Sequence, residues 1–502
     1  ALNVSGWMRE SASTKATMSL CATRATQPFR LSTRISRFTD LRRMLAGMSE
    51  RHTQRLESAA PAASAPPRDV VADVIDNGQV SGQQILVVGL CLLLNMLDGF
   101  DITAMAIVAG SVSQELRLTP DRLGLIFSFA LAGMMAGAMF LAPVSDIIGR
   151  RKLIIMSVAL VGVSILLTAR ATTLTEFFIL RFLSGLGAGA IMACQATLAA
   201  EYSPEKYRSL SIASATAGYP LGAVMTSVVA GLIMPAFGWR GMFWFGGGVT
   251  LALGVVAWAL IPESLKYLFV RRPANALARV NEILVKLDKD TLDHLPTFER
   301  DSARRTLGFV GSITSLISPT HRTVTLTLWV SFFLCFSTLY FLMSWIPRLM
   351  EQTGYSPEVG RLAFFLFNLG GVIGIFLLGA LSTRWRLSNL VYAFLVSSAV
   401  GMVVFATVPN QLTVLMAVIF VVGMLQQGGF TGLYAVAGKM YPTEVRSTGI
   451  GWAIGLGRSG AVVGPAMAGF LIAAGVSMSA NYYVFAVPMA VGGLMASRLK
   501  VK

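Results

Sequence analysis

Runs of apolar residues about 20 positions long, separated by short polar stretches, recur along most of the chain. A helix of about that length is long enough to cross the hydrocarbon core of a bilayer, which is about 30 Å thick. We expect twelve such helices, at residues 84–110, 121–143, 152–170, 174–200, 209–234, 240–261, 325–347, 360–381, 388–408, 411–438, 447–473 and 481–498. The pattern therefore predicts an all-α polytopic membrane protein.

The predicted helices form two sets of six, with a longer polar stretch between them. We expect a six-helix bundle at residues 83–262, a cytoplasmic linker at 263–324, a second bundle at 325–498 and a short tail at 499–502. An internal repeat supports this division. Five residues recur 238 positions later, namely Pro204, Arg208, Ser209, Gly222 and Gly231 as Pro442, Arg446, Ser447, Gly460 and Gly469. Two pseudo-symmetric bundles with a binding site between them are typical of transporters.

Residues 1–82 are expected to form a disordered cytoplasmic tail, because they are polar and include a Pro-, Ala- and Ser-rich stretch. The first 47 positions are rich in Arg, Ser and Thr and poor in acids, a composition that an organellar transit peptide shares. The favoured interpretation is an over-extended start, with Met48 beginning a short natural tail.

The composition agrees with a membrane protein, since 54% of the 502 residues are hydrophobic, 13% are charged and the mean hydropathy is +0.66. The net charge is +16, but the basic residues do not form one face that would suggest nucleic acid. With both termini placed in the cytoplasm, the cytoplasmic segments hold 33 of the 41 Lys and Arg residues. This asymmetry follows the positive-inside rule. Four scattered cysteines and three histidines predict no metal site and no cofactor.

The first predicted helix carries two carboxylates near its middle, Asp98 and Asp101. Their spacing places them on one helical face together with Asn95. Because ionisable groups are costly in hydrocarbon, this face is expected to line a cavity and to serve function. We expect Asp98, Asp101 and a nearby arginine to couple transport to protons.

Two arginines are also predicted to lie inside the membrane, Arg181 in the fourth helix and Arg458 in the eleventh. Arg181 shares a helical face with Gly185, Ala188, Met192 and Gln195. It either serves in coupling or substrate binding or forms a static ion pair with an aspartate. Arg458 lies near the bilayer midplane, where its guanidinium could bind a substrate carboxylate.

Other polar and aromatic side chains fall at similar depths and could contact a substrate or simply pack between helices. The candidates are Tyr219, Tyr340, Trp345, Gln426 and Gln427, with Ser337, Ser344, Phe430 and Tyr434 nearby.

The loop between the second and third predicted helices contains Asp146, Gly149, Arg150 and Arg151. An aspartate at a helix end, beside a glycine turn and basic residues, can form ion pairs that link adjacent helices. The loop resembles the signature of the major facilitator superfamily, although Ala142 and Ile147 replace a glycine and an arginine of that pattern. In the corresponding loop of the second half, Thr383 stands where an aspartate is expected.

Within that superfamily, the run from Asp98 to Asp101 resembles the Asp-Gly-x-Asp motif of the aromatic acid:proton symporter family. Further similar segments are Trp345–Pro347, Gly354–Ser356 and Asn368–Gly374. The resemblance implies two six-helix bundles and alternating access. It also implies import of benzoate-like or hydroxybenzoate-like acids together with protons, by a monomer in a bacterial inner membrane.

Three other function classes remain at this stage. A sugar or other organic-anion porter would share the fold, but the end of the chain lacks the Pro-Glu-Thr segment usual in sugar porters. A sensor that binds ligand without net flux would need a signalling segment, and none is recognised. An enzyme is unsupported, since the sequence shows no catalytic nucleophile pattern, metal cluster or phosphate-binding loop.

Overall fold

The computed structural model describes residues 80–295, 316–319, 321–408, 411–441 and 446–499. Within these ranges, ten helices are long and apolar enough to cross a membrane. The first half contains α3 (Gly82–Glu115), α4 (Pro120–Ala136, continued by three short turns to Ile148), α6 (Arg150–Thr168), α7 (Leu174–Glu201) and α8 (Glu205–Leu260). The second half contains α12 (Arg322–Gln352), α13 (Pro357–Leu381), α14 (Leu387–Thr407), α15 (Leu412–Met440), α16 (Arg446–Ala473) and α17 (Met478–Ser497).

Helix α8 differs from the sequence-based expectation of two separate spans at 209–234 and 240–261. It runs for 56 residues and is interrupted by Gly238, whose φ of 64° and ψ of −167° are not helical. At 1.5 Å per residue it is far longer than one bilayer crossing, so its two arms correspond to two spans. The expected loop is replaced by a kink, because glycine tolerates the positive φ that reverses the chain there.

The last predicted span, 481–498, corresponds to α17, which is not among the ten candidate membrane helices but packs against α12 and α14. With the two arms of α8 counted separately and α17 included, the described helices match the twelve predicted segments. The predicted tail up to residue 79, part of the predicted linker (296–315) and residues 500–502 lie outside the described residues, as does Pro442 of the repeat.

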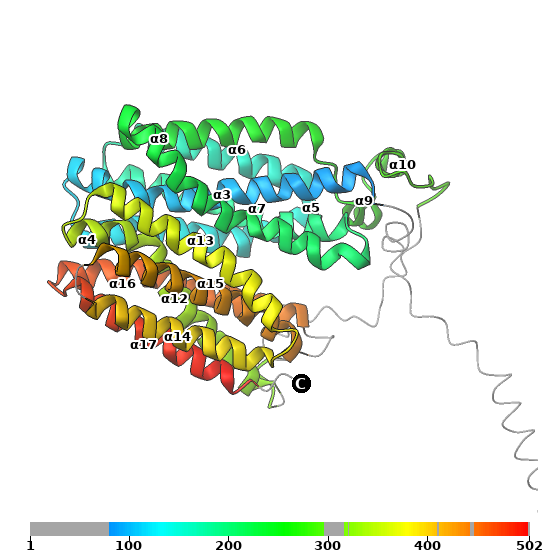
Figure 1. Cartoon of the computed structure of the whole chain (residues 1–502). Coiled ribbons are helices and arrows are strands. Elements are labelled where there is room, and N and C mark those ends of the chain that lie inside the picture. Colours follow the sequence, from blue (N-terminus) through cyan, green and yellow to red (C-terminus); the bar gives the residue numbers. More distant parts are fainter. Residues whose placement is uncertain (1–79, 296–315, 320, 409–410, 442–445, 500–502) are drawn as a thin grey trace, which may run out of the picture. The chain divides into compact units, whose positions relative to one another are not determined.

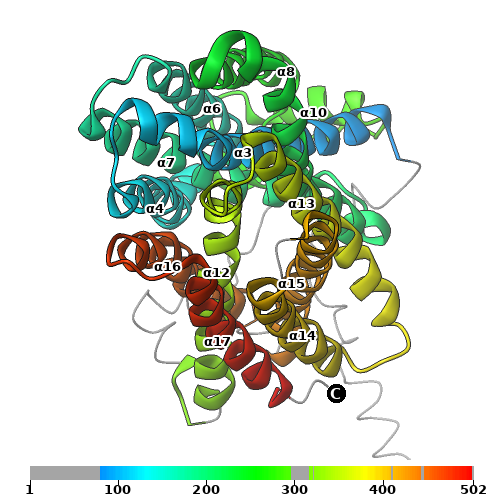
Figure 2. The ribbon, with the colours of Figure 1, turned by 60° about the vertical axis from the view of Figure 1, so that its left-hand side comes forward.

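The two halves are separate groups of helices that lie side by side (Figure 1, Figure 2). Repeat partners take equivalent places in them. A Cβ atom on Gly222 of α8 would lie 2.8 Å from the carbonyl carbon of Met96 in α3, and one on Gly460 of α16 would lie 2.9 Å from that of Phe333 in α12. In each half, therefore, glycine lets a repeat-bearing helix cross closely over the first helix of that half.

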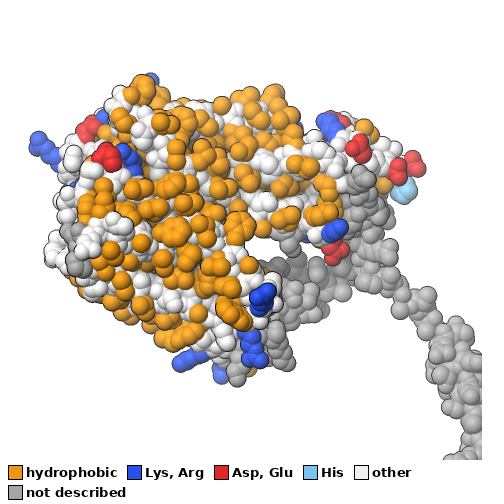
Figure 3. All heavy atoms as spheres, in the orientation of Figure 1, with side chains coloured by type: hydrophobic (Ala, Val, Ile, Leu, Met, Phe, Trp, Pro, Cys, Tyr) orange, Lys and Arg blue, Asp and Glu red, His pale blue; other side chains and the backbone are white. Residues whose placement is uncertain are grey.

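Contacts between the halves are concentrated near the loop that joins α3 to α4. Ser128 of α4 donates a hydrogen bond of 2.6 Å to the Val462 carbonyl of α16, and the rings of Phe127 and Trp345 meet edge to face at 5.7 Å. At the opposite end, which carries α9 (Leu265–Arg271) and α10 (Ala276–Lys286), a hollow separates the halves (Figure 3). The conformation is thus closed at the α3–α4 loop and open toward α9.

Substitution of Gly469 is expected to weaken this closed end. A Cβ atom there would lie 2.6 Å from the Pro120 carbonyl oxygen and 3.1 Å from the Cα of Gly124. Overpacking costs about 1–3 kcal/mol, and we expect Gly469→Leu to shift the ratio of open to closed molecules about tenfold. The measurement is labelling of Ser128→Cys by a membrane-impermeant thiol reagent, which should react faster in the Gly469→Leu background.

The chain offers a matched control, since Gly231 is the repeat partner of Gly469 but a Cβ atom there meets no described atom within 4 Å. Gly231→Leu should leave the labelling rate unchanged. The background is low because Cys91, Cys194 and Cys335 are buried, and Cys21 is replaced by serine for the experiment. Equal labelling in both leucine variants would contradict the assignment of the closed end.

Candidate functional site

The polar face of α3 points into the first half, as its spacing predicts. Asn95 donates hydrogen bonds from its amide nitrogen to the carbonyls of Ala215 (2.9 Å) and Thr216 (3.0 Å) in α8. Gly99 lies against Tyr219, because a Cβ atom on Gly99 would approach the Tyr219 Cα to 3.0 Å. The glycine between the two aspartates therefore permits the close crossing of α3 and α8 that places both carboxylates in the interior.

Asp101 forms an ion pair with Arg181 of α7. The guanidinium Nη2 lies 2.9 Å from Asp101 Oδ1, and Nη1 donates to the Asp101 backbone carbonyl at 3.3 Å. Both side chains are only 1% exposed, and the guanidinium lies 5.2 Å from the centre of the Phe243 ring. The aspartate that pairs with Arg181 in this conformation is therefore Asp101.

Asp98 lies one turn earlier on α3 and is arranged differently. It is buried, and neither carboxylate oxygen has a hydrogen-bond partner among the described residues. The charges that act on it are those of Asp101 on its own helix and Arg458 from the other half. A buried carboxylate that lacks a partner is stable when it binds a proton or when a cation approaches it.

Arg458 of α16 faces the first half. It is 7% exposed, and its Nη2 atom lies 3.2 Å from the sulfur of Met192 in α7. In the described part of the chain, no carboxylate lies within ion-pair distance of it. The guanidinium is therefore a buried cation that lacks its usual partner, a carboxylate, among the residues that the structure describes.

Aromatic side chains of α12 and α15 form a cluster near this cation, and Tyr340 and Tyr434 of the cluster lie within its electrostatic range. Phe336 lies 4.7 Å from Phe430 and stacks at 6.0 Å on Tyr340, measured between ring centres. Gly457 brings Arg458 close to them, since a Cβ atom at that position would lie 2.8 Å from the Phe336 ring. Tyr434 packs on Phe430 at 5.3 Å and lies within electrostatic range of Arg458.

The first half contributes Tyr219 to the same region. Its hydroxyl lies beside that of Tyr340 across the boundary between the halves, and both tyrosines lie within electrostatic range of Asp98 and Arg458. The Tyr219 hydroxyl has no hydrogen-bond partner of normal geometry among the described residues. The structure thus brings together Asp98, Tyr219, Tyr340 and Arg458 as one central site with an aromatic wall.

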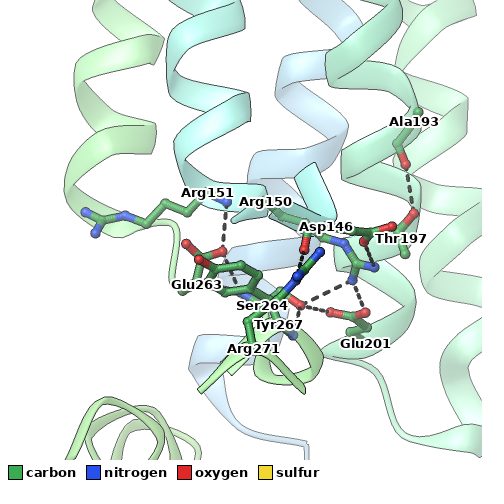
Figure 4. A network of polar contacts seen from close by, with 10 residues as sticks. All are labelled: Asp146, Arg150, Arg151, Ala193, Thr197, Glu201, Glu263, Ser264, Tyr267 and Arg271. Atoms are coloured by element: carbon green, nitrogen blue, oxygen red, sulfur yellow. Dashed lines mark hydrogen bonds and ion pairs between the residues drawn. The ribbon is translucent and has the colours of Figure 1, made fainter. Parts of the chain in front are cut away.

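A second cluster forms at the α9 end, around the loop residues that the sequence singles out (Figure 4). Arg150 forms ion pairs with Glu201 at the end of α7 and, at 3.5 Å, with Asp146. Ser264 donates to Glu201 at 2.6 Å and accepts from Arg150 at 3.2 Å. The expected ion-pair link between adjacent helices is therefore present, and it reaches from the loop to α7 and α9.

Gly149 and Arg151 belong to the same cluster. The backbone nitrogen of Arg151 donates to Glu263 at 3.0 Å, and Arg271 donates to the backbone carbonyl of Asp146 at 2.9 Å. Gly149 has a φ of 103° and lies against Glu263, whose carboxyl carbon would be 3.0 Å from a Cβ atom there. Glycine is thus favoured at this position by its backbone angle. Sequence reasoning did not identify Glu201 and Glu263 as the partners, because both are distant in sequence.

Comparison with known proteins identifies the family. The family model of the Major Facilitator Superfamily matches residues 91–356 and 328–501. The chain belongs to this superfamily. The 4-hydroxybenzoate transporter PcaK of Pseudomonas aeruginosa is 32% identical over 81% of this chain and 90% of its own length. The gallate transporter of Pseudomonas putida is 30% identical over 84% of this chain and 94% of its own length.

The superfamily fold is also found by structure. A D-xylose–proton symporter of known structure superposes with a TM-score of 0.65, at 17% identity, over 83% of this chain and 99% of that one. The predicted two-bundle fold and the resemblance to aromatic acid transporters of the superfamily are therefore confirmed. Membership also agrees with the expectation of a multi-pass transporter rather than an enzyme.

Three of the predicted substrate contacts, Gln426, Gln427 and Trp345, have surroundings that differ from one another. Gln426 is buried, and neither of its amide atoms has a described partner. Gln427 donates to Asn368 at 3.3 Å and so joins α15 to α13. Trp345 donates to the Pro465 carbonyl at 3.1 Å and packs at the closed end, about 7 Å along α12 from Tyr340. The structure does not bring Trp345 into the central site, because its single donor bonds to α16 of the same half and its ring packs on Phe127 of the first half.

Met192 and Gln195 were not named as substrate candidates, although both lie on the helical face of Arg181. Met192 contacts Arg458, and the two amide atoms of buried Gln195, one turn further along α7, have no described partner. The spacing from Arg181 places them on this interior face, but sequence alone does not reveal that α16 lies opposite. Their positions depend on how the two halves meet.

Proposed function

We propose that this protein is a secondary active transporter that imports aromatic carboxylic acids of the benzoate or hydroxybenzoate type together with protons. The observation that supports this most is Arg458, a buried cation that lacks a carboxylate partner in the described structure and lies within electrostatic range of Tyr340 and Tyr434. An aromatic carboxylate fits this arrangement, since its anion can pair with the Arg458 guanidinium and its ring can pack against the nearby aromatic side chains.

The proton would be carried by Asp98. Its buried carboxylate has no partner in the described protein and lies in the field of Arg458. When a substrate anion pairs with Arg458, the charge that favours ionised Asp98 is neutralised, so Asp98 binds a proton more readily. Binding of substrate and binding of proton therefore support each other, which is the thermodynamic basis of symport.

The two halves would rock about the central site, so that it opens to one side at a time. The described conformation is open at the α9 end and closed at the α3–α4 loop. By the positive-inside rule the α9 end lies in the cytoplasm, with both termini, in the inner membrane of a bacterium. The cluster of Asp146, Gly149, Arg150 and Arg151 would hold helix ends of the first half together as a unit during this motion. We propose that one chain suffices for transport.

The test is uptake of labelled acids into vesicles that contain the purified protein, under an imposed pH gradient. Aromatic monocarboxylates should accumulate, whereas aliphatic acids of similar charge and sugars should not. One proton with one monoanion carries no net charge, and so a membrane potential alone should drive no uptake. Each additional proton would instead add about 2.3 kcal/mol per 100 mV.

Preference for a sugar would contradict the aromatic-acid assignment and favour a sugar porter. Counterflow of preloaded substrate provides a separate check, because a sensor that binds without moving its ligand gives none.

A further inference from the structure

A pocket of about 190 Å³ lies outside the central site, where the start of α3, the end of α8 and helix α10 meet. Its walls are formed by the turn after α8, by Arg151 near the start of α6 and by charged side chains of α10. The residues that matter for its chemistry are Arg151, Arg279, Lys286, Glu263 and Glu282. None of them belongs to the proposed substrate site.

The acids of this pocket already have partners. Glu282 accepts a hydrogen bond of 2.8 Å from Lys286, and Glu263 accepts from the backbone nitrogens of Arg151 and Ser264 at 3.0 Å each. The hydrogen bond and charge of Lys286, followed by the charges of Arg279 and Arg151, hold the pKa of Glu282 below its usual range. All three cations therefore lie within electrostatic range of Glu282.

The two arginines are not paired with acids. In the described residues, neither Arg151 nor Arg279 lies within ion-pair distance of a carboxylate, and the buried Nε atom of Arg151 has no hydrogen-bond partner. Two guanidinium groups with free donors are well suited to phosphate oxygens, which they bind through two hydrogen bonds at once.

The pocket also lies at the edge of the apolar surface. Leu260 lines it and is 43% exposed, and Trp258, whose backbone carbonyl accepts from Arg151, is 60% exposed. Exposed tryptophan at the end of a membrane helix is typical of the headgroup region. Helix α10 buries Val280, Ile283 and Leu284 against the rest of the protein and so directs its charged side chains away from that contact.

We propose that this pocket binds the phosphate of an anionic phospholipid, with Arg151 and Arg279 as the anion-binding groups and the acyl chains along Trp258 and Leu260. Because Arg151 and Glu263 also belong to the ion-pair cluster at the α9 end, a bound lipid would stabilise that cluster from the membrane side. The site is independent of the transported substrate, and its test therefore does not require transport.

The experiment uses full-length protein in vesicles of phosphatidylcholine with about one third phosphatidylglycerol, and measures tryptophan quenching by brominated acyl chains. In one sample only phosphatidylglycerol is brominated, and in the other only phosphatidylcholine, so that the headgroup composition is the same. The signal of Trp258 is the difference between the parent and Trp258→Phe. Brominated phosphatidylglycerol should quench it about fivefold more, the effect expected of one basic side chain near an anionic surface.

Arg279→Gln should remove this preference while leaving quenching by brominated phosphatidylcholine intact, which shows that the protein remains folded in the bilayer. Arg384→Gln is the matched control, since Arg384 is an exposed arginine next to the exposed Trp385 between α13 and α14. It should preserve the preference at Trp258.

Equal quenching of Trp258 by the two brominated lipids would overturn the proposal, as would a preference that survives in Arg279→Gln. Excess inorganic phosphate in the buffer distinguishes the source of the phosphate. If it abolishes the preference, the site takes free phosphate rather than a lipid.

Discussion

Asp98→Asn is expected to abolish accumulation of aromatic acid driven by a pH gradient, while leaving exchange of substrate across the membrane. Asparagine has the shape of a protonated aspartate but cannot release a proton, so the carrier would behave as if permanently protonated. Asp98 can be changed in this way because neither of its oxygens has a described partner. The two measurements are gradient-driven uptake and counterflow in the same vesicle preparation.

Asp101→Asn serves as the contrasting variant, since the two aspartates lie three residues apart on one helix. It would leave the guanidinium of Arg181 buried without an acidic partner, which costs about 3–5 kcal/mol. We expect a marked loss of folded protein, measured by thermal unfolding in detergent, rather than selective uncoupling. Uptake by Asp98→Asn that still follows the pH gradient would show that Asp98 does not carry the coupled proton.

Arg458→Ala is expected to weaken binding of aromatic acids by about 30-fold to 5,000-fold, which corresponds to about 2–5 kcal/mol for removing one member of a buried charge pair. Arg458→Lys keeps the positive charge but not the planar pair of donors, and so it should restore only part of the affinity. The measurement is equilibrium binding of labelled benzoate to purified protein, which does not depend on coupling to protons.

Arg361→Ala is a suitable control, since Arg361 pairs with Glu358 near the start of α13 and lies away from the central site. This variant should bind with unchanged affinity. If Arg458→Ala also bound benzoate normally, the anion receptor would have to be another group. A neutral aromatic amide provides a further check, because it should be affected much less than the acid by loss of the guanidinium.

The membrane helices could be predicted from sequence because their signal is local. Each apolar run indicates the length of one helix, and the described helices match the twelve runs apart from one feature. The break between the apolar runs near Gly238 predicts a loop, whereas the structure has a kink there. A single glycine with positive φ can reverse the chain, and the residues on both sides of it remain helical. Trp345 was expected at the substrate site, because depth along a helix does not tell which neighbour its ring will meet.

The sequence predicts which types of side chain form the site, but it does not predict which of them pair with each other. Sequence indicates that an aspartate or arginine inside a membrane must face the interior, and Asp98, Asp101, Arg181 and Arg458 all do. The helical spacing of Asp98 and Asp101 is equally compatible with either one facing Arg181. The packing of α3 against α7 decides in favour of Asp101, and this leaves Asp98 in the field of Arg458.

The sequence by itself determined the fold class, the family and the types of side chain that lie within the membrane, since each depends on hydrophobicity, repeat and motif along one segment. Only the tertiary structure decided which charges neutralise each other and which remain available, since a pair such as Asp101 and Arg181 joins residues 80 positions apart. Likewise, the contact between Met192 and Arg458 exists only because the two halves close on each other at one end. The unpaired Asp98 and Arg458 are thus a property of the packed helices and not of any single one of them.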